Sequence, residues 1–346
     1  MGPGYLLLAV GFGVLSILYY AHQPSKMTNL KFDAEFWAAA GPLIAFRPPR
    51  RPTNALELRA SVNAGLSAML RHALPDGIVE TKHDVKSFDD ETIALYEFAP
   101  AVNETSGKQP ALVYLHGGGI VGGDIDPYSR PLAAKAAVET GLRVFAVEYR
   151  LPPEFPYPTA AEDCYASLAW LSQNAESLGV DPARIGLYAL SAGGGIAAGA
   201  AMMARDRGLS PPLAKQILIY PMLDDRTRAL PDNPLCQFLT WTDTSNQIGW
   251  NAYLGEGKAG GAEIPVYAAP GRAVDVANLP STYIEVGGLD LFCADAVAFA
   301  SRLASANVQM ELHVYPGLPH IFDLYGPLIS LTQRARENRL RAVKSL

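Results

Sequence analysis

Short apolar runs of the kind that form buried strands alternate with longer stretches of helical spacing along most of this chain. The strand-like runs cover residues 93–98, 111–115, 143–149, 185–190, 216–220, 282–286 and 308–315. The helical stretches cover residues 129–141, 160–178, 192–205, 294–306 and 328–343. A helix between two strands makes a crossover, so the joined strands run parallel and helices cover both faces of the sheet. The pattern therefore predicts an α/β fold around a mostly parallel sheet, with residues 93–98 as an early antiparallel strand.

Two regions interrupt this alternation. Residues 30–74 have apolar positions at helical spacing on either side of a proline-rich linker (RPPRRP, residues 47–52), which predicts two short helices. Residues 235–261 contain an inserted helix that begins near Thr242 and Asp243 and ends in a glycine-rich loop. Open α/β sheets bind ligands at the carboxyl ends of their strands, so we expect these two regions to form a cap over that edge.

The composition restricts the classes of protein to which the chain can belong. Its formal charge of -6 and isoelectric point near 5.6 argue against a nucleic-acid partner, because phosphate binding needs a basic surface. The cysteines are sparse and widely spaced, so we expect free thiols and no metal site; they are Cys164, Cys236 and Cys293. The sequence contains no H-E-x-x-H, C-x-x-C or phosphate-binding G-x-x-x-x-G-K motif. We therefore expect side chains to carry the chemistry without a metal ion or another cofactor.

The N-terminal segment, residues 1–26, differs from the rest of the chain. Residues 5–20 (YLLLAVGFGVLSILYY) form an uncharged apolar run, slightly shorter than the ~17 residues of a minimal membrane span. The first basic residues all follow it, namely Lys26, Lys31, Arg47, Arg50 and Arg51. This charge pattern predicts a membrane anchor in residues 1–26, with the domain of residues 27–346 on the cytoplasmic side. The alternatives are a cleaved signal of a secreted protein and a buried or peripheral helix of a soluble cytoplasmic one.

Ser191 lies at a predicted strand-to-helix turn, in the stretch LYALSAGGGI (residues 187–196). In such a turn the hydroxyl is raised above the sheet and faces the helix N-terminus, as in a nucleophile elbow. The usual elbow sequence is G-x-S-x-G, whereas here Ala189 and Leu190 precede the serine. A serine that merely caps a helix is the alternative interpretation.

Three glycines follow the strand predicted at residues 111–115, in the sequence HGGG (residues 116–119). Glycine has no Cβ, so such a loop exposes backbone N–H groups that can bind a developing oxyanion. Taken alone, the triplet would indicate a flexible turn. It stands at the end of a strand that precedes the serine, however, as an oxyanion loop should. This position favours the functional interpretation.

A nucleophilic serine needs a base, and the base needs a group that orients it. In this topology the acid and then the histidine follow the serine, at the ends of later strands. Asp290 follows the strand predicted at residues 282–286, and His320 follows the strand predicted at 308–315. Asp295 is a weaker alternative, because it begins a helix where an acid acts as a cap. The other histidines are less favourably placed in the sequence; they are His22, His72, His83, His116 and His313.

Together these motifs resemble those of the hormone-sensitive-lipase-like family of α/β-hydrolase esterases. The matching motifs are HGGG at residues 116–119, YRLPPE at 149–154, ALSAGG at 189–194, DLFCAD at 290–295 and HIF at 320–322. The family's own spellings of the middle three are YRLAPE, GDSAGG and DPLxD. The chain departs from them at Ala189 and Leu190 and lacks the proline after Asp290. The resemblance covers the chain from about residue 27 to its end.

The resemblance implies an α/β-hydrolase fold with a mostly parallel eight-stranded sheet and helices on both faces. It also implies a helical cap from about residues 30–74 and 235–261. The site residues that it implies are Ser191, Asp290 and His320 as the triad, Gly118, Gly119 and Ala192 as donors of the oxyanion hole, and Gly117 as a residue that shapes the loop. The expected reaction is hydrolysis of a carboxylic ester through an acyl-enzyme.

The predicted cap is rich in aromatic residues, which indicates an apolar pocket for a hydrophobic ester or lactone. We expect three of them to line the pocket: Trp241, Trp250 and Tyr253. The alternative is that each holds the cap on the body of the protein. The final helix carries several arginines and could meet solvent, a second subunit in a homodimer, or a membrane surface.

Two other function classes use the same fold. A lyase or cyclase keeps the oxyanion hole and uses the triad only for proton transfer. A ligand receptor usually has a broken triad, so the complete set of residues in this sequence argues against a receptor. The esterase interpretation is therefore favoured, with the lyase or cyclase as the alternative.

Overall fold

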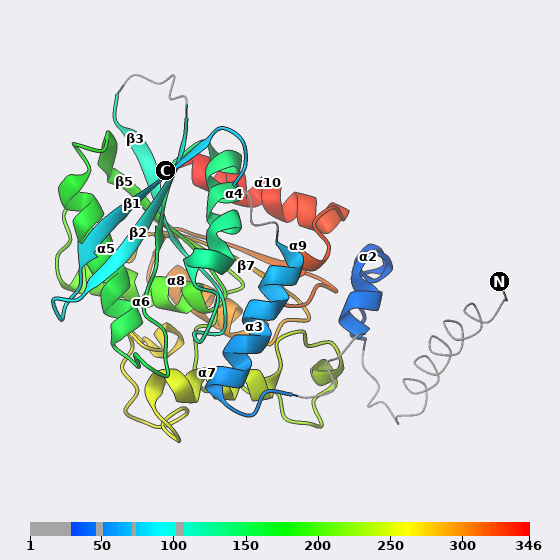
Figure 1. The fold of residues 1–346 in the computed structure, drawn as a ribbon. Helices are drawn as coiled ribbons and strands as arrows, with labels where there is room; N and C mark the ends of the chain where they lie inside the picture. Colours follow the sequence, from blue (N-terminus) through cyan, green and yellow to red (C-terminus); the bar gives the residue numbers. More distant parts are fainter. Residues whose placement is uncertain (1–28, 46–50, 71–73, 102–106) are drawn as a thin grey trace.

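The computed structural model describes residues 29–45, 51–70, 74–101 and 107–346 and shows an α/β fold around one sheet (Figure 1). The predicted membrane anchor, residues 1–26, lies outside the described residues. Within the described ranges, no helix combines the length and the apolar character that crossing a membrane requires.

The sheet has eight strands in the order β1-β2-β4-β3-β5-β6-β7-β8. Their bounds are β1 Ile78–Lys86, β2 Thr92–Pro100, β3 Gln109–Leu115, β4 Arg143–Val147, β5 Val180–Leu190, β6 Lys215–Ile219, β7 Ser281–Gly287 and β8 Met310–Tyr315. β2 is antiparallel to both of its neighbours, β1 and β4, and every other pairing is parallel. The mostly parallel sheet with an early antiparallel strand is thus confirmed.

Strand β1 has no counterpart among the predicted strands. Its sequence, IVETKHDVK, mixes apolar and charged residues, and only Val85 within it is buried. As the first strand of the sheet, β1 has a neighbour on one side only, so most of its side chains stay partly in water. A strand of this kind lacks the continuous apolar run by which the central parallel strands are recognised.

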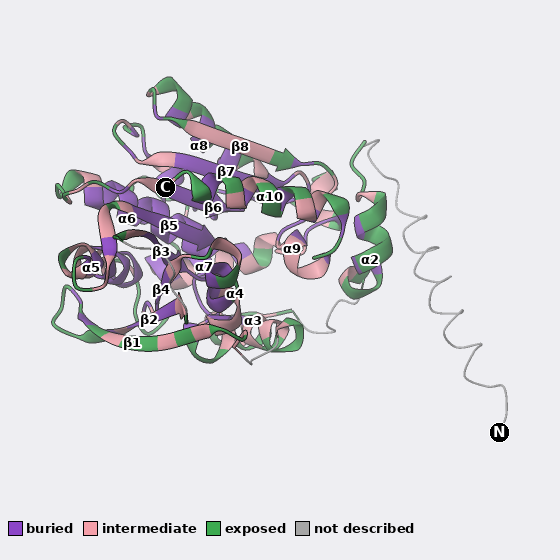
Figure 2. Cartoon of the chain, turned by 90° about the horizontal axis from the view of Figure 1, so that it is seen from above, coloured by how far each residue is buried: buried purple, intermediate pink, exposed green. Residues whose placement is uncertain are grey.

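Helices cover both faces of the sheet. Their bounds are α2 Ala34–Ala45, α3 Ala55–Met69, α4 Arg130–Thr140, α5 Thr159–Asn174, α6 Ala192–Asp206, α7 Asp243–Leu254, α8 Cys293–Ser305, α9 Phe322–Tyr325 and α10 Ser330–Lys344. Figure 2 shows the sheet between α4 and α10 on one side and α5, α6 and α8 on the other. Both faces are therefore dry, which explains why side chains of the central strands such as Val113, Leu187 and Leu218 are fully buried.

Helices α3 and α7 belong to the two regions that interrupt the alternation in the sequence. They contact each other and lie side by side at one edge of the molecule (Figure 1). Asn54 caps the start of α3 and Thr242 caps the start of α7, each by accepting a backbone N–H from the first turn. The predicted helical character of both regions is thus found in the structure.

Three of the four arginines of α10 pair with acids on the body of the protein. Arg339 is buried and bonds to Glu285 of β7 and to Asp323 of α9. The other two pairs join Arg336 to Glu139 and Arg341 to Glu311. These pairs tie the final helix to the sheet and to α4.

Candidate active site

Ser191 lies between the end of β5 and the start of α6, with φ of 53° and ψ of −118°. Its N–H donates to the carbonyl of Ile219 (2.9 Å), and its own carbonyl accepts the N–H of Met222 (2.9 Å). These bonds hold the turn against the end of β6 and present the side chain above the sheet edge. The hydroxyl makes no capping hydrogen bond to α6. The structure therefore does not support the alternative in which this serine only caps the helix.

The start of α6 fits closely against its surroundings, which explains the run of small residues there. A Cβ on Gly193 would lie 2.4 Å from the carbonyl oxygen of His116, and a Cβ on Gly195 would lie 2.1 Å from that of Met222. Ala189 lies within β5 and is fully buried, so its extra methyl group is accommodated. Leu190 lines the cavity described below.

Ser191, His320 and Asp290 form a chain of hydrogen bonds. Ser191 Oγ lies 2.8 Å from Nε2 of His320, and Nδ1 of the same ring lies 2.7 Å from Asp290 Oδ2. The second carboxylate oxygen, Oδ1, accepts the N–H of Phe292 (2.9 Å). All three side chains are buried. Because the imidazole donates Nδ1–H to the carboxylate, Nε2 is left free to accept the serine proton.

The loops that carry Asp290 and His320 are joined to each other. The N–H of Leu289 donates to the carbonyl of Leu318 (2.9 Å), and the N–H of Gly288 donates to that of Tyr315 (2.7 Å). Thr240 Oγ1 donates to the carbonyl of His320 (2.8 Å), which gives the histidine backbone a further bond. The acid and the histidine are thus held by the ends of two adjacent strands, β7 and β8.

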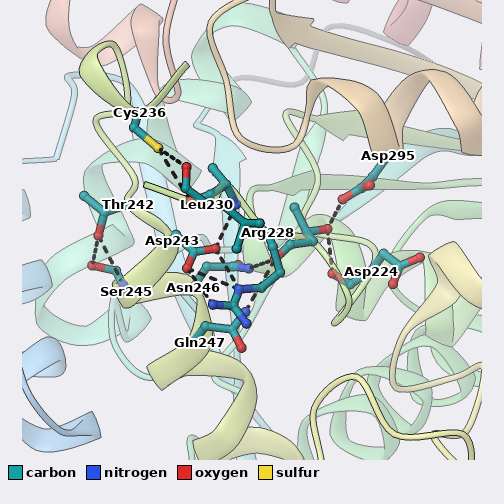
Figure 3. Close-up of polar contacts among 12 residues, drawn as sticks. Asp224, Arg228, Leu230, Cys236, Thr242, Asp243, Ser245, Asn246, Gln247 and Asp295 are labelled. Atoms are coloured by element: carbon teal, nitrogen blue, oxygen red, sulfur yellow. Dashed lines mark hydrogen bonds and ion pairs between the residues drawn. The ribbon is translucent and has the colours of Figure 1, made fainter. Parts of the chain in front are cut away.

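The alternative acid, Asp295, belongs to a different network. It accepts a hydrogen bond from the hydroxyl of Thr227, whose carbonyl in turn accepts Asn246 Nδ2 of α7 (3.0 Å; Figure 3). Asp243 at the start of α7 accepts the N–H of Ala229 (2.9 Å). Asp295 therefore joins α8 to the segment around Thr227 and Ala229, to which α7 is bonded.

The glycine loop, which we define as residues 117–123, lies beside Ser191. Gly118 and Gly119 have φ of 134° and 64°, which favours glycine, and a Cβ on Gly118 would lie 1.9 Å from the carbonyl oxygen of Gly122. A Cβ on Gly117 would lie 3.2 Å from Cβ of Ser191. Within the described chain, the amides of Gly118, Gly119 and Ala192 donate no hydrogen bond to another protein group. These N–H groups remain available to a ligand oxygen.

His116 holds the first residue of this loop. Its ring stacks on Tyr149 with the centroids 4.1 Å apart, and its Nδ1 lies 2.7 Å from the carbonyl oxygen of Gly117. Burial lowers the pKa of His116 to about 4, so the ring is neutral at pH 7 and donates Nδ1–H to that carbonyl. The hydroxyl of Tyr149 donates to the carbonyl of His116 (2.8 Å). His116 therefore shapes the loop and does not act as the base, since His320 is the histidine bonded to Ser191.

Sequence reasoning did not identify the groups around the His320 ring. Tyr220 and Phe292 both meet it edge to face, at centroid distances of 4.9 and 5.1 Å. Burial raises the pKa of Tyr220 well above its usual value, so its hydroxyl stays protonated and donates to Asp323 (3.0 Å). No motif marks Tyr220; its place immediately after β6, beside the other strand ends, is the one available signal.

An apolar cavity of about 410 Å³ opens onto Ser191 and His320. Helices α2 and α3 form one wall, with Leu43, Ile44, Leu58, Val62, Leu66 and Met69. The opposite wall comes from the body and from the segment before α7, with Leu190, Tyr220, Leu239 and Trp241. The cavity therefore lies between the triad residues and the helices that the sequence predicted as a cap.

Only one of the three predicted pocket aromatics lines this cavity. Trp241 precedes α7 and faces the cavity, whereas Trp250 and Tyr253 within the helix do not line it and are 1% exposed. Tyr253 packs edge to face on Tyr157, with the centroids 5.7 Å apart. Residues 250 and 253 are three apart, so they share the face of α7 that packs on the body. For these two the alternative, holding the cap on the body, is what the structure shows.

The part of the chain that the structure describes offers neither a reactive thiolate nor a cluster of metal ligands beside the serine. Burial, with Asp290 and Asp295 nearby, raises the pKa of the Cys293 thiol to about 11, so this cysteine stays protonated at neutral pH. Among the described residues, no group of His, Cys, Asp and Glu side chains is arranged to hold a metal ion.

Comparisons with known proteins agree with this geometry. The family described as "alpha/beta hydrolase fold" matches residues 112–324. The esterase LipI of Mycobacterium tuberculosis is 35% identical over 239 residues, 68% of this chain and 73% of that protein, and the carboxylesterase NlhH of the same species is 35% identical over 238 residues with the same coverage. The solved structure of a bacterial heroin esterase superposes with a TM-score of 0.81 at 33% identity, over 91% of this chain and 98% of that one. The chain therefore belongs to the α/β-hydrolase family, within its hormone-sensitive-lipase-like group of esterases, and is a serine hydrolase of the carboxylesterase type.

Proposed function

We propose that this enzyme hydrolyses hydrophobic carboxylic esters or lactones through an acyl-enzyme on Ser191. The observation that carries the proposal is the continuous hydrogen-bond chain from Ser191 Oγ through His320 to Asp290, with distances of 2.8 and 2.7 Å. In this arrangement Ser191 is the nucleophile, His320 the general base and Asp290 the group that orients the imidazole.

In the first step, Ser191 Oγ attacks the ester carbonyl carbon, and its proton passes to Nε2 of His320. The carbonyl π electrons move to the oxygen, which becomes an oxyanion. The amides of Gly118, Gly119 and Ala192 bind this oxyanion, and each such donor is worth roughly 3–4 kcal/mol in a comparable enzyme. Collapse of the intermediate expels the alcohol, which takes the proton from His320.

In the second step, a water molecule replaces the alcohol. His320 accepts a proton from the water as the water oxygen attacks the acyl carbon, and the same amides bind the second oxyanion. Collapse then releases the carboxylic acid and returns the proton to Ser191. With a lactone, the alcohol and the acid remain parts of one product.

The apolar cavity supports a hydrophobic substrate. More than half of the described residues that line it are aliphatic or aromatic, and the polar ones are mostly serines and threonines. Arg51, which is exposed, is the one Lys, Arg, Asp or Glu among these described lining residues. Burial of each CH₂ group of a substrate chain contributes about 0.8 kcal/mol, so chains that fill the cavity bind more tightly than an acetyl group. The regions at about residues 30–74 and 235–261 act as the cap in this proposal, because α2, α3 and Trp241 supply much of the lining.

Membrane association through residues 5–20 is a further part of the proposal, with the catalytic domain on the cytoplasmic side. In the sequence the uncharged run precedes α2, whose Trp37 and Leu43 residues are 46% and 63% exposed. Fractionation of cells that express the full chain or residues 27–346 tests this part. Equal recovery of both chains in the soluble fraction would count against it.

The catalytic proposal is tested with a fluorophosphonate probe and a series of aromatic esters from acetate to dodecanoate. We expect the parent enzyme to be labelled and to hydrolyse the longer esters, and Ser191→Ala to lose both activities while it stays folded by circular dichroism. An unlabelled parent, or ester turnover that survives Ser191→Ala, would sink the proposal. Turnover of a non-ester substrate that persists in Ser191→Ala would instead support the lyase or cyclase alternative.

A further inference from the structure

Helix α3 holds the far end of the glycine loop by two polar contacts. Arg59 Nε donates to the carbonyl of Val121 (2.6 Å), and Asn63 Oδ1 accepts the N–H of Gly123 (2.9 Å). A Cβ on Gly122 would lie 2.9 Å from Asn63 Oδ1, so the helix rests directly on the loop. Neither Arg59 nor Asn63 contacts Ser191 or His320 by a hydrogen bond or ion pair in the described structure.

Arg59 is itself fixed in place. Its guanidinium pairs with Glu154 (2.6 Å) and donates to the carbonyl of Pro152 (2.7 Å). The Nε–H that reaches Val121 is therefore held at a defined position by a planar group with three partners. A lysine, whose ammonium is a single point of charge, cannot reproduce this set of bonds.

The opposite side of the loop is covered by the second cap region. A Cβ on Gly119 would lie 2.1 Å from the ring of Trp241, and a Cβ on Gly249 of α7 would lie 2.5 Å from the carbonyl oxygen of Gly119. The loop is thus enclosed between α3 on one side and α7 with Trp241 on the other.

The loop needs such support because its own backbone is unfavourable. Ile120 has φ of 70°, and β-branched residues rarely adopt the left-handed region. Gly118, Gly119 and Gly123 also have positive φ. The loop's internal backbone bonds are those from the amides of Val121 (3.3 Å) and Gly122 (3.1 Å) to the carbonyl of Gly118. Outside contacts must therefore keep the amides of Gly118 and Gly119 in register with Ser191.

We propose that Asn63 and Arg59 of the cap are positioning residues for the oxyanion hole, and this inference rests on the proposed esterase function. By fixing the amide of Gly123 and the carbonyl of Val121, they hold the glycine loop in the conformation that stabilises the oxyanion. The same helix lines the cavity with Leu58, Val62 and Leu66. A substrate chain that packs on α3 therefore contacts the element that aligns the oxyanion donors.

The test compares Asn63→Leu, which is close to asparagine in size but accepts no hydrogen bond, with Asn63→Asp, which keeps an acceptor oxygen. We expect Asn63→Leu to lower kcat for an aromatic ester about tenfold or more, with KM within about threefold of the parent, because the lost interaction acts in the transition state. We also expect it to weaken inhibition by an alkyl trifluoromethyl ketone, whose serine adduct carries an oxyanion. Asn63→Asp should restore both values to near those of the parent.

A second variant keeps the test decisive if Asn63→Leu does not fold. Arg59→Lys retains a cation beside Glu154 but loses the bond to Val121, and we expect the same pattern of lower kcat with little change in KM. Parent-like kcat and ketone inhibition in a folded Asn63→Leu or Arg59→Lys would overturn the inference, and so would equal losses in Asn63→Leu and Asn63→Asp. If the parent itself is not labelled by the fluorophosphonate, the esterase proposal fails and this inference fails with it.

Discussion

Ser191, Asp290 and His320 lie at the ends of three strands of one sheet, whereas the glycine loop beside Ser191 is contacted by helices α3 and α7 from distant parts of the chain. The triad side of the site is tied together by bonds between neighbouring strand ends, such as that from Leu289 to Leu318. The far end of the loop is bonded to α3 and is covered by α7, and these helices belong to the two regions outside the alternating pattern. The proposed catalytic site thus has one half set by the sheet and another half held by the two regions that we propose as a cap.

The largest loss of activity is expected from a substitution in the half of the site at the strand ends. Asp290→Asn should lower kcat about 10⁴-fold, because the amide no longer holds the imidazole in the tautomer that accepts the serine proton. Steady-state kinetics with an aromatic ester measure the loss. Asp295→Asn is the matched control, since this acid bonds to Thr227, and its kcat should stay near that of the parent. Equal losses in the two variants would mean that the triad acid has been wrongly assigned.

The next largest effect should come from the loop side. Gly119→Ala places a methyl group where the Trp241 ring lies and should displace the oxyanion donors, lowering kcat about 10²- to 10³-fold. Gly141→Ala is its control, because Gly141 has a similar φ of 70° but nothing within 4 Å of the added methyl group. Kinetics and thermal unfolding of both variants separate the contact from the backbone strain. A kcat for Gly119→Ala within twofold of that for Gly141→Ala would contradict the assignment of the loop.

Substitutions of two tryptophans should separate the lining of the cavity from the attachment of α7 to the body. Trp250→Ala should lower the free energy of unfolding by about 3–5 kcal/mol, because it creates a cavity in the core where α7 packs on the body. Trp241→Ala should instead reduce the preference for long over short acyl chains, by about tenfold in the ratio of kcat/KM values. Urea unfolding and the aromatic ester series provide the two measurements. A changed chain-length preference in Trp250→Ala and an unchanged one in Trp241→Ala would reverse these roles.

The weakest effect is expected on stability, at the bond between Asp295 of α8 and Thr227. Burial raises the pKa of Asp295 to about 6 from its ordinary value of 3.8, so the folded protein binds this proton more tightly than the unfolded chain does. Its contribution to stability is complete below about pH 4 and is lost as the pH rises through about 6. Between about pH 4 and about pH 6, the parent should therefore lose roughly 1–3 kcal/mol of unfolding free energy relative to Asp295→Asn. Urea unfolding of both proteins at several pH values in this range measures the difference, and a difference that does not change with pH would contradict the expectation.

The half of the site at the strand ends can be predicted from the sequence more clearly than the half at the glycine loop. Asp290 and His320 could be predicted because strand ends in a parallel sheet meet at one edge, so position along the chain is enough. Trp250 could not be separated from Trp241 in this way, because the face that α7 turns to the body depends on packing. Asn63 and Arg59 carry no local signal at all, since each acts through a backbone group about 60 residues away.

For the fold, the strands that could be predicted are those with a continuous apolar sequence. The central parallel strands have such a sequence because helices cover both faces of the sheet. Strand β1 was not, because its side chains alternate with charges at the margin of the sheet. The short helix α9, which brings Asp323 to Tyr220, is too brief to give a periodic pattern.

The backbone angles at Ser191 have a consequence for the stability of the whole enzyme. A non-glycine residue held at φ of 53° and ψ of −118° costs of order 1–3 kcal/mol, which is a substantial part of the 5–15 kcal/mol that keeps a typical domain folded. A chain with glycine at this position would avoid that strain and lose the proposed nucleophile. The reactive conformation is therefore a local instability that the rest of the fold sustains, and natural selection for stability alone would remove it.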